Sequence, residues 1–101
     1  MKVMTGAFTG TGTAFNVDTV GFKPGRIEFF NRTGLTRCVF TKEMPAASLA
    51  KQINHATVQH AFVTTNGVTL RSAGFTVGTD ADINTSGELV YWTAYETGLH
   101  E

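Results

Sequence analysis

Hydrophobic and polar residues alternate with a period of two along most of this chain. In residues 88–96 the alternation places Val90 and Trp92 on one face of an extended strand. Tyr91 and Tyr95 fall on the opposite face of the same strand. Because apolar side chains occupy both faces, we expect one face to be covered by an opposing sheet. The other would be covered by a loop or by a neighbouring subunit.

The same period predicts further strands separated by turn residues. They are expected at residues 13–18, 26–31, 35–41, 57–65 and 74–79. Asn66 and Gly67 lie between two strand-like runs, and such a pair favours a type I′ turn because both central positions need a positive φ. The pattern therefore predicts a β-hairpin at Asn66-Gly67.

One segment, from Met44 to Ile53, has helical potential. Pro45 is acceptable in a first helical turn, and most of the residues after it are good helix formers. Leu49 and Ile53 are four positions apart and would share a helix face. The sequence leaves open whether this segment is a short helix or an ordered loop.

Short strands joined by turns favour an all-β fold class, with one β-sandwich or jelly-roll-like domain and at most one short helix. The composition agrees, since threonine, phenylalanine and glycine are all abundant. A length of 101 residues suits a single domain spanning residues 1–101. Residues 1–13 are a candidate extended N-terminal arm.

Charge is sparse and balanced, and this narrows the possible partners. The chain has 8 basic and 8 acidic residues, and charged residues make up 16% of it, against roughly 25% in ordinary soluble domains. The absence of a basic excess argues against nucleic-acid binding, and no apolar run approaches the ~18 residues of a membrane span. The N-terminus has no secretory signal pattern, so we expect synthesis in a cytoplasm. Few charges and zero net charge favour association with other subunits.

Known catalytic and metal-binding patterns are not matched. Cys38 lies in an apolar run, where a thiol behaves as a small hydrophobe. His55 and His60 would lie on opposite faces of a strand, which does not suit a zinc site. The glycine-rich residues 6–13 lack the Lys-Ser/Thr ending of a phosphate-binding loop. We therefore expect no enzyme activity, no catalytic residues, no cofactor and no metal centre.

The segment from Asp80 to Asn84 has two interpretations. Asp80, Asp82 and Asn84 place oxygen ligands at alternate positions, as a calcium-binding loop does. However, Thr85 occupies the position where such a loop has glycine, and Tyr91 the position of its closing glutamate. The alternative is a surface turn in which short polar side chains bind nearby backbone groups. A weak calcium site therefore stays open at this stage.

Several stretches resemble small virion-associated proteins of tailed bacteriophages. The likeness is carried by GFTVGTDADINTSGELVYWTAY from Gly74 onward, by FTGTGTAFNV and GFKPGRIEFFN near the N-terminus, and by MPAASLAKQ and VTTNGVT in the middle. The matching positions are glycines, aromatic residues and turns, and they include no catalytic motif.

The resemblance implies a structural protein of the virion, made in the host cytoplasm. We expect a capsid decoration or cement protein that binds the major capsid protein as a homo-oligomer, with a trimer favoured. The residues predicted to lie at subunit or capsid interfaces are Phe8, Phe15, Tyr91, Trp92 and Tyr95. The alternative is a tail or tail-fibre module that binds a host-surface glycan near Asp80 to Asn84, so head or tail location stays open.

Overall fold

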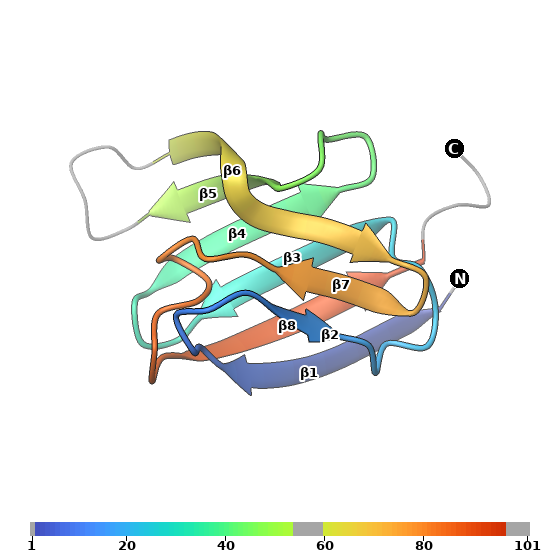
Figure 1. Cartoon of the computed structure of the whole chain (residues 1–101), viewed down its shortest axis with the longest axis horizontal. Coiled ribbons are helices and arrows are strands. Elements are labelled where there is room, and N and C mark those ends of the chain that lie inside the picture. Colours follow the sequence, from blue (N-terminus) through green and yellow to red (C-terminus); the bar gives the residue numbers. More distant parts are fainter. Residues whose placement is uncertain (1, 54–59, 97–101) are drawn as a thin grey trace.

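The computed structural model describes residues 2–53 and 60–96, which form one antiparallel sheet of eight strands in the order β1-β8-β3-β4-β5-β6-β7-β2 (Figure 1). The strands are β1 (Val3–Thr9), β2 (Phe15–Val17), β3 (Arg26–Asn31), β4 (Thr36–Thr41), β5 (Ser48–Ile53), β6 (His60–Arg71), β7 (Gly74–Val77) and β8 (Leu89–Tyr95). The described residues contain no helix, and hence none that could span a membrane. The all-β fold class is confirmed.

The two layers expected of a sandwich are supplied by one curled sheet. β7 lies opposite β3 and β8, and their aromatic rings meet edge to face in the interior (Figure 1). The ring centroid of Phe75 is 5.6 Å from that of Phe29 and 5.4 Å from that of Trp92. The hydrophobic core therefore fills the space inside a half-barrel, where each half of the sheet covers the other.

β8 shows the predicted alternation clearly. Val90, Trp92 and Ala94 are buried on the side that faces the core, which we call the inner face. Tyr91 points the other way and is 41% exposed, on what we call the outer face. The predicted cover therefore exists on one side of β8 only. In a single copy of the chain, the outer side of this strand is open to solvent at Tyr91.

The prediction of a hairpin at Asn66-Gly67 is wrong, because β6 runs continuously through these residues. Asn66 does adopt the positive φ that the pair favours, at 63°. This conformation accompanies a shift of register against β5 between Ser48 and Leu49, which bends the strand. Before the bend β6 pairs with β5. After it, Val68 still pairs with Ser48 of β5, and residues 68–71 pair with β7, so the sheet bends at the Asn-Gly pair. Residues 57–59 of the predicted strand lie outside the described residues.

The segment from Met44 to Ile53, expected to be a short helix or an ordered loop, contains no helix. Its second half is the strand β5. Ala47 has a φ of 66°, which is incompatible with a helix that continues through it. β5 pairs with β4 on one side and β6 on the other, and the Leu49 side chain is fully buried. Two sets of strand pairing and this burial outweigh the weak helical propensity of the residues.

The remaining strand predictions agree with the structure to within two residues. Residues 13–18, 26–31, 35–41 and 74–79 contain β2, β3, β4 and β7. The N-terminal residues 1–13 include β1, which pairs with β8 from Val3 opposite Tyr95 to Thr9 opposite Leu89. β1 thereby becomes one edge of the sheet, and β2 is the other edge.

Candidate functional site

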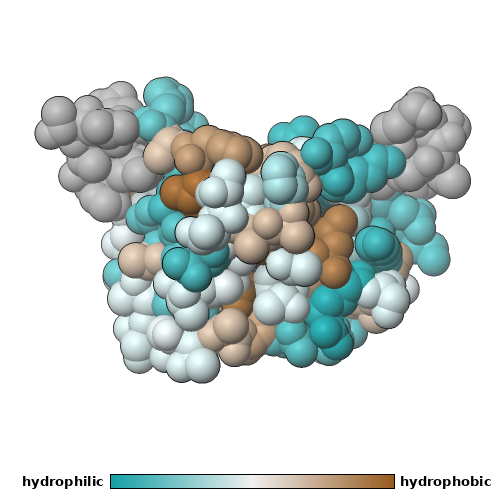
Figure 2. All heavy atoms as spheres, turned by 45° about the horizontal axis from the view of Figure 1, so that its top comes forward, coloured by the Kyte–Doolittle hydropathy of each residue, from teal (hydrophilic) through white to brown (hydrophobic). Residues whose placement is uncertain are grey.

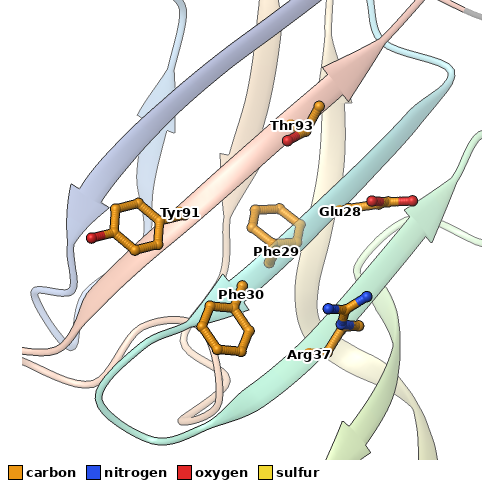
Figure 3. A pocket seen from close by; sticks show the side chains of 6 residues that line it. All are labelled: Glu28, Phe29, Phe30, Arg37, Tyr91 and Thr93. Carbon is orange, nitrogen blue, oxygen red and sulfur yellow. The ribbon is translucent and has the colours of Figure 1, made fainter.

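The outer face of the central strands carries aromatic side chains in register. Strand pairing places Tyr91 beside Phe30, and Phe30 beside Arg37, so one row of side chains crosses β8, β3 and β4. The next row contains Thr93 and Glu28 (Figure 3). This arrangement follows from the register of the sheet, because residues directly opposite one another on neighbouring strands point to the same face.

Between these side chains lies a shallow hollow of about 120 Å³, lined by Glu28, Phe29, Phe30, Arg37, Tyr91 and Thr93. Phe30 is 38% exposed at this hollow. The Arg32 guanidinium donates a hydrogen bond to the Tyr91 hydroxyl at 3.2 Å, which fixes the ring at the rim. Glu28 is bound by Arg26 at 2.6 Å, so its charge is balanced within the same strand.

A second hollow of about 170 Å³ lies on the other side of Arg37, against Val39, Ala50 and Gln52. Ala50 is opposite Phe62 of β6, whose side chain is 55% exposed. The apolar surface thus extends from β8 to β6. We call this surface the outer band, and it consists of Phe30, Val39, Ala50, Phe62, Tyr91 and Thr93.

The chemistry of the outer band suits contact with another surface. It offers flat aromatic groups and the hydroxyl groups of Tyr91 and Thr93, and the cationic side chain of Arg37 lies beside them. Exposed apolar areas rimmed by polar groups mark interaction sites. In the view of Figure 2, hydrophobic residues form separate small areas among hydrophilic and weakly polar ones.

The predicted interface residues divide between the two faces. Phe8 and Phe15 meet edge to face, with ring centroids 5.0 Å apart, and pack against the core. Trp92 is also internal, at 5% exposure. Tyr91 and Tyr95 lie on the outer face. The structure therefore brings the first three residues into one interior aromatic chain and leaves the two tyrosines outside.

Phe30 and Phe62 belong to the outer band although sequence reasoning did not select them. For Phe30 a signal exists, because Phe29 and Phe30 are consecutive in a strand and one of the two rings must face outward. For Phe62 no comparable signal exists, since its orientation depends on its pairing with Ala50 of β5.

A buried ionic cluster occupies the inner face, at the loop between β7 and β8. The Lys51 ammonium lies 2.7 Å from an Asp80 oxygen and 2.9 Å from an Asp82 oxygen. Burial lowers the pKa of Lys51, but its hydrogen bonds to the two carboxylates outweigh this and raise it. Lys51 thus stays charged and offsets one of the two negative charges that Asp80 and Asp82 bring to the loop.

Cys38 lies beside this cluster and is held as a neutral thiol. Burial raises its pKa to about 12, and the nearby carboxylates of Asp82 and Asp80 add to the rise. A thiol in this state is a poor nucleophile, because the reactive form is the thiolate. The location therefore agrees with the prediction that Cys38 packs as a small hydrophobe.

The loop from Asp80 to Asn84 uses its oxygen atoms within the protein. Asp80 accepts a hydrogen bond from the backbone N–H of Asp82 at 2.9 Å, which is the predicted local turn. The two aspartates also bind Lys51. Within the part of the chain that the structure describes, no group of three or more His, Cys, Asp or Glu side chains is placed to hold a metal ion.

Asn84 is buried and joins three segments of the chain. Its side-chain oxygen accepts hydrogen bonds from the backbone N–H groups of Thr11, at 2.7 Å, and Gly12, at 3.2 Å. Its amide nitrogen donates to the carbonyl oxygens of Thr13, at 2.9 Å, and Gly78, at 2.8 Å. With all of these bonds made, Asn84 has a structural role and is not available to a ligand.

Fold and surface together define a small all-β module with a filled interior and an exposed aromatic band on the outer face of its sheet. No family model, curated protein or solved structure matches the chain.

Proposed function

We propose that this chain is a non-enzymatic structural subunit of a tailed-bacteriophage virion, and that it decorates the capsid by binding the major capsid protein. The observation that carries the proposal is the exposed outer band, whose central strands β3, β4 and β8 have a fully buried inner face. The resemblance of the sequence to virion proteins is the reason for proposing a virion as the assembly. The outer band is the surface that we propose contacts the major capsid protein.

The sparse charge of the chain supports a protein partner. In the rows of the outer band the charged groups are Arg37 and Glu28, and Glu28 is already bound by Arg26. Charged residues are depleted and aromatic residues enriched at the centres of protein interfaces. Covering the band would stabilise the complex by about 25 cal/mol for each Å² of apolar area removed from water.

The proposal is tested on particles of the phage that encodes the chain. Quantitative mass spectrometry of purified virions is expected to find it in numbers comparable with those of the major capsid protein. Absence from the particles would overturn the proposal. A copy number typical of tail proteins would overturn the decoration role and favour the tail alternative.

Variants connect the outer band to attachment. Phe30→Ala combined with Tyr91→Ala is expected to abolish incorporation into particles while the circular dichroism spectrum stays unchanged. Leu35→Ala is the matched control, because Leu35 is 54% exposed but lies in the turn between β3 and β4, outside the band. Normal incorporation of the double variant would exclude the outer band as the attachment surface.

One observation favours a second candidate, a tail or fibre module that binds a host glycan. The hollow at Tyr91 combines an exposed ring with the polar groups of Arg37, Glu28 and Thr93, and sugars bind by stacking and hydrogen bonding to such groups. The loop from Asp80 to Asn84, where sequence reasoning placed this site, uses its polar groups internally. Reproducible binding on a glycan array, lost in Tyr91→Ala, would favour this candidate over capsid decoration.

A further inference from the structure

The two edges of the sheet differ in length and protection. β2 has three residues, its Asn16 side chain accepts a hydrogen bond from Thr76, and the adjacent Asp18 binds Arg71 at 2.7 Å. β1 has seven residues and contains no charge and no proline. Short length, charged side chains and proline are the usual protection of an edge strand against pairing with another chain, and β1 has none of the three. β1 is therefore the edge prepared for pairing.

The pairing with β8 determines which groups of β1 face outward. The Lys2 carbonyl accepts from the Glu96 N–H, and the Gly10 N–H donates to the Glu88 carbonyl, both at 2.8 Å. In an antiparallel ladder the direction of these bonds alternates along the strand. The even-numbered residues of β1 thus bond to β8. The N–H and C=O groups that point away from the sheet belong to Val3, Thr5, Ala7 and Thr9, and no described residue is hydrogen-bonded to them.

We infer that two copies of the chain pair through their β1 edges as antiparallel strands related by a two-fold axis at Gly6. In this register Val3 lies opposite Thr9 of the partner subunit, and Thr5 opposite Ala7 of the partner subunit. Every outward-facing N–H and C=O group of β1 is then bonded. The contact is isologous, so it closes after two copies.

The side chains of β1 favour a second copy over a foreign strand. No residue of β1 is charged, so the two-fold pairing places no like charges together. Val3 is 50% and Met4 40% exposed in the single chain, and both become covered. Met4 then lies across from Phe8 of the partner subunit, which adds an apolar neighbour on the side of β1 away from Ala94.

The inferred pairing goes beyond the proposed function, because it uses the edge of the sheet and leaves the outer band free. It gives a dimer where the resemblance to virion proteins implies a trimer. It also joins the sheets of two half-barrels into one continuous sheet, so that each dimer carries two outer bands. The isolated, full-length chain is sufficient to test it.

The experiment is size-exclusion chromatography with light scattering on the full chain and on Thr5→Pro. The Thr5 N–H points outward, so proline there removes a donor from the proposed contact and none from the β1–β8 ladder. We expect a dimer for the wild-type chain and a monomer for Thr5→Pro. The circular dichroism spectrum and the unfolding midpoint measured on the monomer should show that the fold is kept.

Hydrogen exchange tests the register independently. In the wild-type dimer the amides of Val3, Thr5, Ala7 and Thr9 are expected to exchange slowly, and in Thr5→Pro the remaining three should exchange at least tenfold faster. A wild-type monomer would overturn the inference, as would a dimer that survives Thr5→Pro. Phe30→Ala with Tyr91→Ala should leave the dimer intact, so a failure of virion attachment and a failure of β1 pairing give different results.

Discussion

Phe29 and Phe30 are neighbours in the chain and have the same side chain, yet one packs in the core and the other lies on the exposed outer face. Phe29 is 1% exposed and packs between the rings of Phe8 and Phe75. Phe30 is 38% exposed and lies beside Tyr91 on the outer face. The inner face of β3, β4 and β8 is buried in a single copy, whereas the outer face leaves apolar area that nothing in the described chain covers. The comparison indicates that the interior holds the fold and that the outer face is available for a partner.

The ionic groups of the two faces follow the same division. On the inner face, Lys51 and the two aspartates that bind it have side chains only 9–19% exposed. On the outer face, Arg26 and Glu28 form an ion pair of similar length with side chains 36–48% exposed. Solvent screens the second pair strongly and the first much less. Equal distances therefore do not mean equal contributions to stability.

The largest expected effect is the difference in unfolding free energy between the alanine variants of Phe29 and Phe30. Phe29→Ala removes a ring from the interior aromatic chain and is expected to lower the free energy of unfolding by about 3–5 kcal/mol. Phe30→Ala removes a partly solvated ring and is expected to cost about 1 kcal/mol or less. Urea unfolding of the isolated chain measures both. Similar losses for the two variants would refute the division between the faces.

The second effect concerns Lys51. Lys51→Met leaves the Asp80 and Asp82 carboxylates poorly solvated and unpaired, so we expect a loss of about 2–4 kcal/mol. Arg26→Met is the matched control on the outer face, where the loss should stay below about 1 kcal/mol. Combining Lys51→Met with Asp80→Asn and Asp82→Asn should recover part of the stability, because the unpaired charges are removed. A combined variant less stable than Lys51→Met would show that the carboxylates stabilise the loop by other contacts.

Local alternation was sufficient to predict β3, β4, β7 and β8, because each strand buries every second residue against one core. It was insufficient for β5, whose residues are good helix formers and whose strand conformation depends on pairing with β4 and β6. At Asn66 the positive φ could be predicted, but its use in a bend could not. That use depends on β5, whose register against β6 shifts there.

The candidate site was predictable to a similar extent. Tyr91 follows from the alternation in β8, and Phe30 follows from the Phe-Phe pair once one ring is known to be internal. The cluster of Lys51, Asp80 and Asp82 could not be found from spacing, because the lysine and the aspartates come from distant parts of the sequence. Only the curl of the sheet brings the loop between β7 and β8 against β5.

The third effect tests how closely the inner face is packed. A Cβ atom at Gly6 would collide with the indole of Trp92, which lies across the strand from it. Gly6→Ala is therefore expected to cost about 1–3 kcal/mol, as overpacking of a core does. Thr5→Ala, one residue away on the outer face, is the control and should change stability little. Trp92→Phe should reduce the cost of Gly6→Ala, and a double-mutant cycle by urea unfolding measures that coupling. Additive losses would contradict the contact.

The smallest effect is a dependence on alkaline pH that arises from Cys38 on the inner face. The Cys38 thiol has a pKa of about 12 in the folded chain, against 9.0 for an ordinary thiol. Above pH 9.0 the unfolded chain loses this proton while the folded chain keeps it, so stability falls as pH rises toward 12. The raised pKa of Lys51 acts in the same direction, but only above its ordinary value of 10.5. Between pH 9.0 and 10.5 the decline should therefore come mainly from Cys38.

Cys38→Ala separates this contribution from all others, because it removes the titrating thiol and keeps a small apolar side chain. The slope of unfolding free energy against pH from 9.0 to 10.5 should be shallower in Cys38→Ala than in the wild-type chain. Alkylation at pH 9.0 should be slow in the folded chain and fast after denaturation in urea. Rapid alkylation of the folded chain would mean that water reaches the inner face at Cys38. The contrast between a sealed interior and an open outer band would then fail at that position.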